Sequence, residues 1–323
     1  MTRSRPADWG SVRPSYFAFP FGIIGLASSW QAAARTLAAP AWIGPALPIL
    51  AAGTWLAVCL AYLVRLARHP AAVRGELSDP AMSPFTAFAP ICAALLGAGL
   101  VHYAQSGGRV VAAIGIALTM SFGAWWTAER VLGDGLRLDQ VHSAYLIPMC
   151  VGGIEAADAA SAADWGTLAR LCLGVGVLGW AGFGSLTLAR LVLRPLPAPP
   201  LRPTLAIDAA VAAAVGVAYF NVYGTPPGSA AYAIAGYGLV MAGVQARLLP
   251  RYLSAPFTPG TWVFAFAAAV TATDVTFWIS AIHGAPRWPA WAMLTAASAL
   301  VAWIAARTAL IVTRRRDTGP TLA

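Results

Sequence analysis

Long apolar stretches, divided by short polar or proline- and glycine-containing breaks, constrain what this chain can fold into more than any other feature. A helix needs about 20 mostly apolar residues to cross the hydrocarbon core of a bilayer. Hydrophobic residues make up 59% of the chain and charged residues only 10%, which is too apolar for a soluble protein. We therefore expect an all-α integral membrane protein with ten transmembrane helices in a single domain, residues 1–323, with short tails at about 1–15 and 313–323. The ten stretches lie near residues 16–37, 43–66, 85–105, 110–132, 143–160, 165–193, 204–223, 229–249, 260–283 and 288–312.

The arginines indicate how these helices are oriented. All 21 basic residues are arginine, and cytoplasmic loops of membrane proteins carry an excess of basic residues. If the N-terminus is cytoplasmic, every arginine falls on the cytoplasmic side except Arg35, Arg109, Arg170 and Arg287. An odd number of helices would spoil this alternation. The sequence thus predicts a multi-pass protein of the plasma membrane, the inner membrane of a bacterium, with both termini cytoplasmic. The positive charge is interpreted as orientation and not as a nucleic-acid-binding surface.

The odd-numbered stretches form a repeat. They begin near residues 16, 85, 143, 204 and 260, a spacing of about 60 that indicates five consecutive helical hairpins. A repeat of this kind is typical of a ring around an axis. Pro20, Pro90 and Pro148 fall at similar depths in the first three odd stretches. Proline removes a backbone donor and bends a helix, which neighbours or a water-filled cavity can accommodate. These bends could line a pore, or be kinks in a packed bundle.

Acidic residues inside the apolar stretches are the first candidates for function, because ionisable groups are costly to place there. Glu155, Asp158, Asp208 and Asp274 all fall in odd-numbered stretches. Asp158 and Asp208 are close enough to helix ends to be interfacial. Glu155 and Asp274 are candidate carboxylates of a lumen, or a structural buried pair.

Two phenylalanines near the start of the ninth stretch are candidates for a gate. Phe264 and Phe266 lie several residues inside it, where a phenyl ring can plug a narrow lumen and exclude water. Core packing is the alternative interpretation.

The sequence does not indicate an enzyme. Catalysis or metal binding needs several groups to converge, whereas His69, His102, His142 and His283 are scattered over four segments. The four cysteines lie in apolar runs without a C-x-x-C spacing. We expect no catalytic residues, no cofactor and no metal site.

Four local patterns, taken in order, resemble the tellurite-resistance and four-carbon dicarboxylate transporter family, which includes the slow anion channels of plants. They are YFAFPFGIIGLASSW (16–30), ELSDPAMSPFTAFAPI (76–91), LRPTLAI (201–207) and PFTPGTWVFAF (256–266). Their order and spacing cover nearly the whole chain. The chain departs from the family pattern at Asp79, where a histidine commonly precedes the proline, and at Ala267, where proline or glycine often follows the phenylalanine.

The resemblance implies a fold and a mechanism. The fold is five helical hairpins in a quasi-fivefold ring, with the odd-numbered helices around a central pore and three protomers, each with its own pore, forming a homotrimer. A phenylalanine of the ninth helix would plug the pore, which maps onto Phe266 first and Phe264 second. Family anion pores tend to be short of charge, unlike a pore lined by Glu155 and Asp274. Either these carboxyls are protonated or paired, or they face away, or the chain carries something other than a monovalent anion.

The leading hypothesis is a membrane channel or transporter that passes small inorganic or carboxylate anions and is gated by Phe266. The first alternative is a proton-coupled exporter of C4-dicarboxylates or of oxyanions such as tellurite or sulfite, in which Glu155 or Asp274 takes up a proton. A membrane enzyme or a haem or copper protein would need His102 and His142 to converge. A structural or sensor subunit would show no flux.

Overall fold

The protein is built of helices. A computed structural model describes residues 12–40, 42–133 and 136–317, and these ranges contain helices but no strand. The expected all-α class is therefore confirmed for this part of the chain. The expected tails lie partly outside the described residues, as do Arg3 and Arg5, which contribute to the predicted orientation.

Five helical segments alternate along the chain with five others, and each of the first five begins with a tight 3₁₀ turn. Proline at the first or second position of four of these turns fixes the backbone for a helix start and needs no backbone donor there. The segments are η1 (Pro14–Phe17) with α1 (Ala18–Thr36), η2 (Ser83–Ala87) with α4 (Phe88–Val101), η4 (Ser143–Leu146) with the π-helical η5 (Ile147–Val151) and α6 (Gly152–Ala162), η7 (Pro199–Ala206) with α9 (Ile207–Tyr223), and η8 (Pro259–Trp262) with α11 (Val263–Ala281).

The alternating segments are mostly longer and uninterrupted. They are α2 (Ile43–Arg68), α5 (Gln105–Leu132), α7 (Gly166–Gly179) with the π-helical η6 (Trp180–Gly184) and α8 (Ser185–Leu193), α10 (Ser229–Leu253), and α12 (Trp288–Asp317). Two short elements, α3 (Pro70–Ser78) and η3 (Leu138–Gln140), lie in connections.

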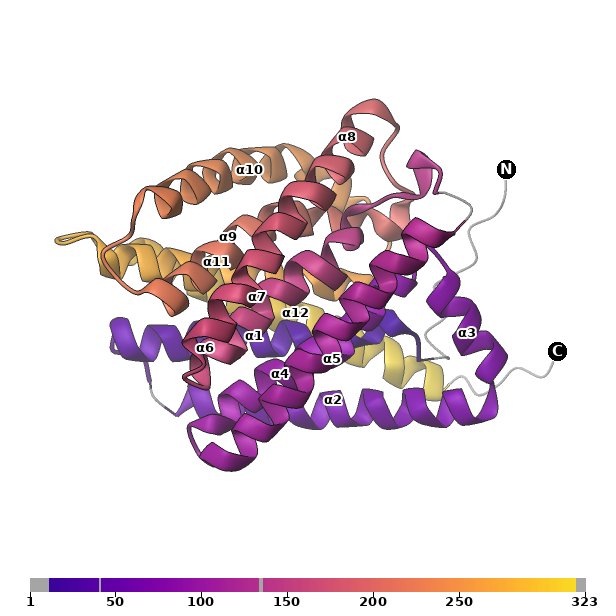
Figure 1. Ribbon diagram of the computed structural model, residues 1–323, viewed down its shortest axis with the longest axis horizontal. Coiled ribbons are helices and arrows are strands. Elements are labelled where there is room, and N and C mark those ends of the chain that lie inside the picture. Colours follow the sequence, from indigo (N-terminus) through magenta and orange to yellow (C-terminus); the bar gives the residue numbers. More distant parts are fainter. Residues whose placement is uncertain (1–11, 41, 134–135, 318–323) are drawn as a thin grey trace.

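The segments with 3₁₀ starts form the interior. In the most apolar part of the spans 14–36 and 199–223, 72% of the residues are buried, whereas only 6% are buried in the span 229–253. The buried helices also contact one another in a closed cycle: α1 packs on α4, α4 on α6, α6 on α9, α9 on α11, and α11 on α1. In Figure 1, α9, α11 and α1 lie between α10 and α2. The core is therefore made where these five buried segments meet.

Nine helices of the described chain are long and apolar enough to cross a membrane. They correspond to nine of the ten expected stretches. In the sixth of these, α7, η6 and α8 follow one another directly and form one span, 166–193. The expected stretch 143–160 is not among them. There Pro148 lies in the π-helical turn η5, so three helix types share the segment. The count of ten stays a prediction, as does a fivefold ring.

Glycines bring α4 and α5 into backbone contact. A Cβ atom added to Gly97 of α4 would overlap the backbone nitrogen of Ala112, and one added to Gly115 of α5 would overlap that of Ala94. Small residues at such positions let membrane helices approach closely, so van der Waals contact between backbones can hold the pair together. Gly99, also on α4, has open space beside it.

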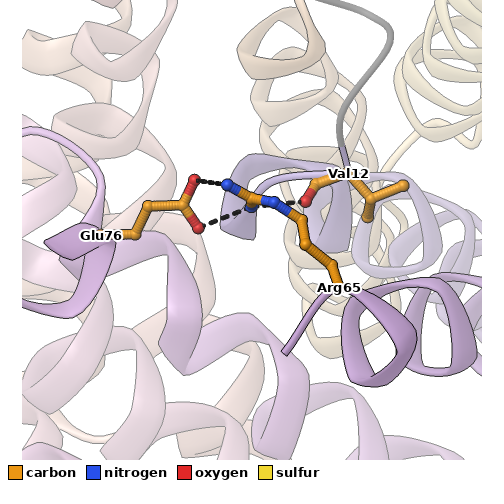
Figure 2. A network of polar contacts seen from close by, with 3 residues as sticks. All are labelled: Val12, Arg65 and Glu76. Atoms are coloured by element: carbon orange, nitrogen blue, oxygen red, sulfur yellow. Dashed lines mark hydrogen bonds and ion pairs between the residues drawn. The ribbon is translucent and has the colours of Figure 1, made fainter. Parts of the chain in front are cut away.

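One buried ion pair joins the start of the chain to the connection after α2. Arg65, in the last turn of α2, makes two hydrogen bonds of 2.8 and 2.7 Å to the carboxylate of Glu76 on α3, and it donates another of 2.8 Å to the carbonyl oxygen of Val12 (Figure 2). Side-chain exposure is only 16% for Arg65 and 13% for Glu76. The network holds α2, α3 and the entry to η1 together at one end of the bundle.

Candidate functional site

Two cavities lie along the interior of the buried segments. The first, called here the apolar cavity, has a volume of only about 20 Å³, close to the least space that holds a water molecule. Every one of the five buried segments contributes to its wall, and every side chain in that wall is apolar. Its lining residues are Phe21, Phe88, Ile147, Val151, Ile207, Ala210, Val211, Ala214, Val263 and Phe266.

The second, called here the polar cavity, is much larger, at about 260 Å³. It lies toward the ends of α1, α6, α9 and α11 that are remote from their 3₁₀ starts. Its polar lining includes one arginine, two carboxyls, two amides and three hydroxyls: Arg35, Glu155, Asp158, Gln31, Asn221, Ser28, Ser161 and Thr273.

Phe266 lies between the two cavities and is the one residue in both linings. Its ring stacks on that of Phe21 with centroids 3.8 Å apart, and the ring of Phe21 lies 4.5 Å from that of Phe88. Three phenylalanines from α1, α4 and α11 thus lie side by side in the wall of the apolar cavity. A Cβ atom added to Gly25 would lie 2.9 Å from Cδ2 of Phe266, so this glycine leaves the ring its space.

Phe264, the second gate candidate, lies elsewhere. Its ring meets the ring of Tyr252 on α10 edge-on at 4.9 Å, and it belongs to neither cavity lining. Two residues along a helix correspond to a rotation of about 200°, so neighbours in the W-x-F-x-F pattern point in opposite directions.

The three prolines expected to bend the pore helices mark changes of helix type. Pro20 and Pro90 are each the third residue of an α-helix that follows a 3₁₀ turn, and Pro148 is the second residue of η5. Each lies within two residues of a side chain in the apolar cavity: Phe21, Phe88 or Ile147. A bend of the pore helices at these prolines stays a prediction.

The two candidate lumen carboxyls lie in different surroundings. Glu155 is 4% exposed and lines the polar cavity. Asp274 does not line it, and packs instead between α11 and α9, where a Cβ atom on Gly216 would overlap its Oδ1 atom. No hydrogen bond within the described part of the chain joins the two carboxyls.

The other two acids are partnered. Asp158 lines the polar cavity and accepts a hydrogen bond of 2.9 Å from Nδ2 of Asn221, while Ser161 donates one of 2.6 Å to the carbonyl of Asn221. Asp208 is buried and accepts hydrogen bonds from the hydroxyls of Ser143 and Thr187. Asp158 thus joins α6 to α9, and Asp208 joins α9 to η4 and α8.

Several lining residues were not predicted from the sequence, among them Phe21 and Phe88. For the polar cavity a signal existed, because Ser28, Gln31 and Arg35 follow one another at intervals of three and four residues on one face of α1. Asn221 carried no such signal, since its role depends on α6 lying beside α9.

His142, one of the scattered histidines, lies directly before η4 and is 2% exposed. Its ring meets that of Tyr145 edge-on at 5.3 Å. Burial lowers the pKa of His142 to about 4. Among the residues that the structure describes, no group of three or more His, Cys, Asp or Glu side chains is arranged to hold a metal ion.

A family model described as SLAC1, voltage-dependent anion channel, matches residues 11–309. The comparison with curated proteins gave no match.

Proposed function

The chain belongs to the voltage-dependent anion channel family, whose model covers residues 11–309, and from this premise we propose that it passes small anions through a pore in each protomer, gated by Phe266. The family consists of membrane channels and transporters for anions. The substrates we propose are small inorganic or carboxylate anions.

The proposed pore follows the axis of the five buried segments. Their closed cycle of contacts supports a quasi-fivefold ring of five hairpins, which counts the segment 143–162 as the tenth span. All five segments contribute to the apolar cavity, which supports placing the narrowest part of the pore there. A constriction lined only by apolar side chains gates by excluding water.

The observation that carries the gate is the position of the Phe266 ring. It separates the apolar cavity from the polar cavity and stacks on Phe21, so an ion travelling along this axis meets it. The opening step that we propose is a rotation of this side chain away from Phe21.

The proposal also includes the membrane in which the pore lies, the orientation of the chain and its oligomeric state. The distribution of arginines supports a plasma-membrane protein, in bacteria an inner-membrane protein, with both termini cytoplasmic. A homotrimer is proposed on the family resemblance.

The test is anion flux through purified protein in liposomes. Chloride and nitrate currents should be at least about tenfold larger for Phe266→Ala than for the wild type, because removing the ring widens an apolar constriction. Phe264→Ala is the matched control, since its ring lies against α10, and it should behave as the wild type does. Equal currents in Phe266→Ala and wild type would remove the gate from Phe266.

A second candidate function is favoured by the carboxyls Glu155 and Asp158 in the polar cavity. In a proton-coupled exporter of C4-dicarboxylates or oxyanions such as tellurite or sulfite, a carboxyl takes up a proton during transport. Flux that requires a pH gradient would support the exporter, whereas flux independent of the gradient would support the channel.

A further inference from the structure

Glu155 lies beside the constriction. It follows Val151 by four residues, about one turn of helix, and Val151 lines the apolar cavity whereas Glu155 lines the polar cavity. On α11, Val263 and Val270 flank Phe266 in the same way, one in each lining. The carboxyl of Glu155 is therefore at the edge of the polar cavity that adjoins the phenylalanine constriction.

Glu155 also differs from its neighbour Asp158 in its partners. Asp158 accepts the hydrogen bond from Asn221, but within the described ranges no hydrogen bond reaches the carboxyl of Glu155. Although Glu155 is only 4% exposed, it lines the polar cavity, whose volume of about 260 Å³ has room for water beside the carboxyl.

Few charges face this carboxyl from the helices packed around it. Asp158 is on its own helix, Arg35 of α1 lies at the exposed mouth of the polar cavity, and Arg109 of α5 is held by Asp164 and the carbonyl of Ala163. The thiols of Cys92 and Cys150 also lie near this carboxyl. The acids of α9 and α11 in the described chain, Asp208 and Asp274, do not line the polar cavity, and the side chains that these helices contribute to it, such as Val217, Asn221 and Thr273, are neutral.

We propose that Glu155 is a charge filter at the constriction: anions pass from the polar cavity into the apolar cavity only while Glu155 carries a proton. This inference rests on the proposed function. Arg35 at the mouth attracts anions, and the ionised carboxylate of Glu155 repels them at the next step. Asp158 does not act as the filter, because its carboxyl accepts the hydrogen bond from Asn221 and so joins α6 to α9.

The proposal predicts how anion current depends on pH. In wild type, chloride current should rise by about tenfold or more as the pH on the polar-cavity side is lowered from about 8 to about 5, because repulsion by one carboxylate in a narrow passage is removed. Glu155→Gln should carry the larger current throughout this range, with no pH dependence. Asp158→Asn is the matched control: its current should still rise as the pH is lowered, with the midpoint of the rise moved toward lower pH, because a negative charge about one helical turn from Glu155 is removed.

Three results would overturn the filter. They are an unchanged pH dependence in Glu155→Gln, its loss in Asp158→Asn instead, and a wild-type current that follows sodium rather than pH when sodium is replaced by choline. The last would assign the carboxyl to a bound cation.

A spectroscopic measurement keeps the filter testable if no variant conducts, which would contradict the proposed function but not by itself the filter. Infrared difference spectra of the purified protein should show a protonated carboxyl band that titrates with pH and is missing in Glu155→Gln. A spectrum in which Glu155 stays ionised at every pH would refute the filter, whatever the currents show.

Discussion

The ring of Phe266 stacks on the ring of Phe21, with centroids 3.8 Å apart and ring planes inclined by 16°. The two side chains come from α11 and α1, at opposite ends of the chain, and both line the apolar cavity. Phe21 therefore belongs to the proposed gate as much as Phe266 does, although only Phe266 contacts the polar cavity.

Replacement of Phe21 by alanine should increase anion current, but less than Phe266→Ala does. Without the Phe21 ring, the ring of Phe266 loses its stacking partner, which is worth about 0.5–1.5 kcal/mol, and rotates away more often. Liposome currents for the two single variants and the double variant measure this. If each ring acts through the other, the double variant should resemble Phe266→Ala alone. Full additivity would contradict a shared gate.

The sequence predicted those features that depend only on the residues within one helix. Apolar length predicted nearly all of the spans, and the W-x-F-x-F pattern placed a phenyl ring in the interior. The 3₁₀ starts were not predicted, because proline early in a segment indicates a bend without specifying the helix type that accommodates it.

What could not be predicted depends on contacts between segments far apart in the chain. Glu155 and Asp274 are both acids in buried helices, and nothing in their local sequence tells that one lines a cavity while the other packs against Gly216. Likewise, Asp158 differs from Glu155 only because Asn221 of α9 reaches it.

Gly97→Ala should destabilise the protein, whereas Gly99→Ala should not. A methyl group on Gly97 would overlap the backbone of α5 at Ala112, and overpacking of this kind costs about 1–3 kcal/mol. Gly99 lies on the same helix with open space beside it, so alanine is tolerated there and favours the helix. Thermal unfolding in detergent, followed by size-exclusion chromatography, compares the two. Equal melting temperatures would show that α4 and α5 are less closely packed than described.

The ion pair of Arg65 and Glu76 should contribute to stability (Figure 2). Glu76→Gln would leave a charged, mostly buried guanidinium facing a neutral amide, at a cost of about 1–3 kcal/mol. Arg137 and Asp139 form an exposed pair at 2.6 Å, with side chains 76% and 50% exposed, and Asp139→Asn is therefore the control. It should leave the melting temperature unchanged, because exposed pairs are screened by solvent. A loss in both variants, or in neither, would contradict this assignment.

Acid should destabilise the protein through His142. Burial lowers its pKa to about 4 in the folded state, against about 6.5 for an unperturbed histidine. Between these two values the unfolded chain binds a proton that the folded chain does not, so stability rises with pH across this window and is lost as the pH falls through it. A difference of this size corresponds to at most about 3 kcal/mol.

Urea unfolding at several pH values should show a shallower loss of stability toward acid in His142→Gln than in wild type. His102→Gln, at an exposed position, should keep the wild-type profile. If His142→Gln and wild type lose stability in parallel below about pH 6.5, the acid sensitivity belongs to other groups, and the neutral histidine at the start of η4 does not contribute to it.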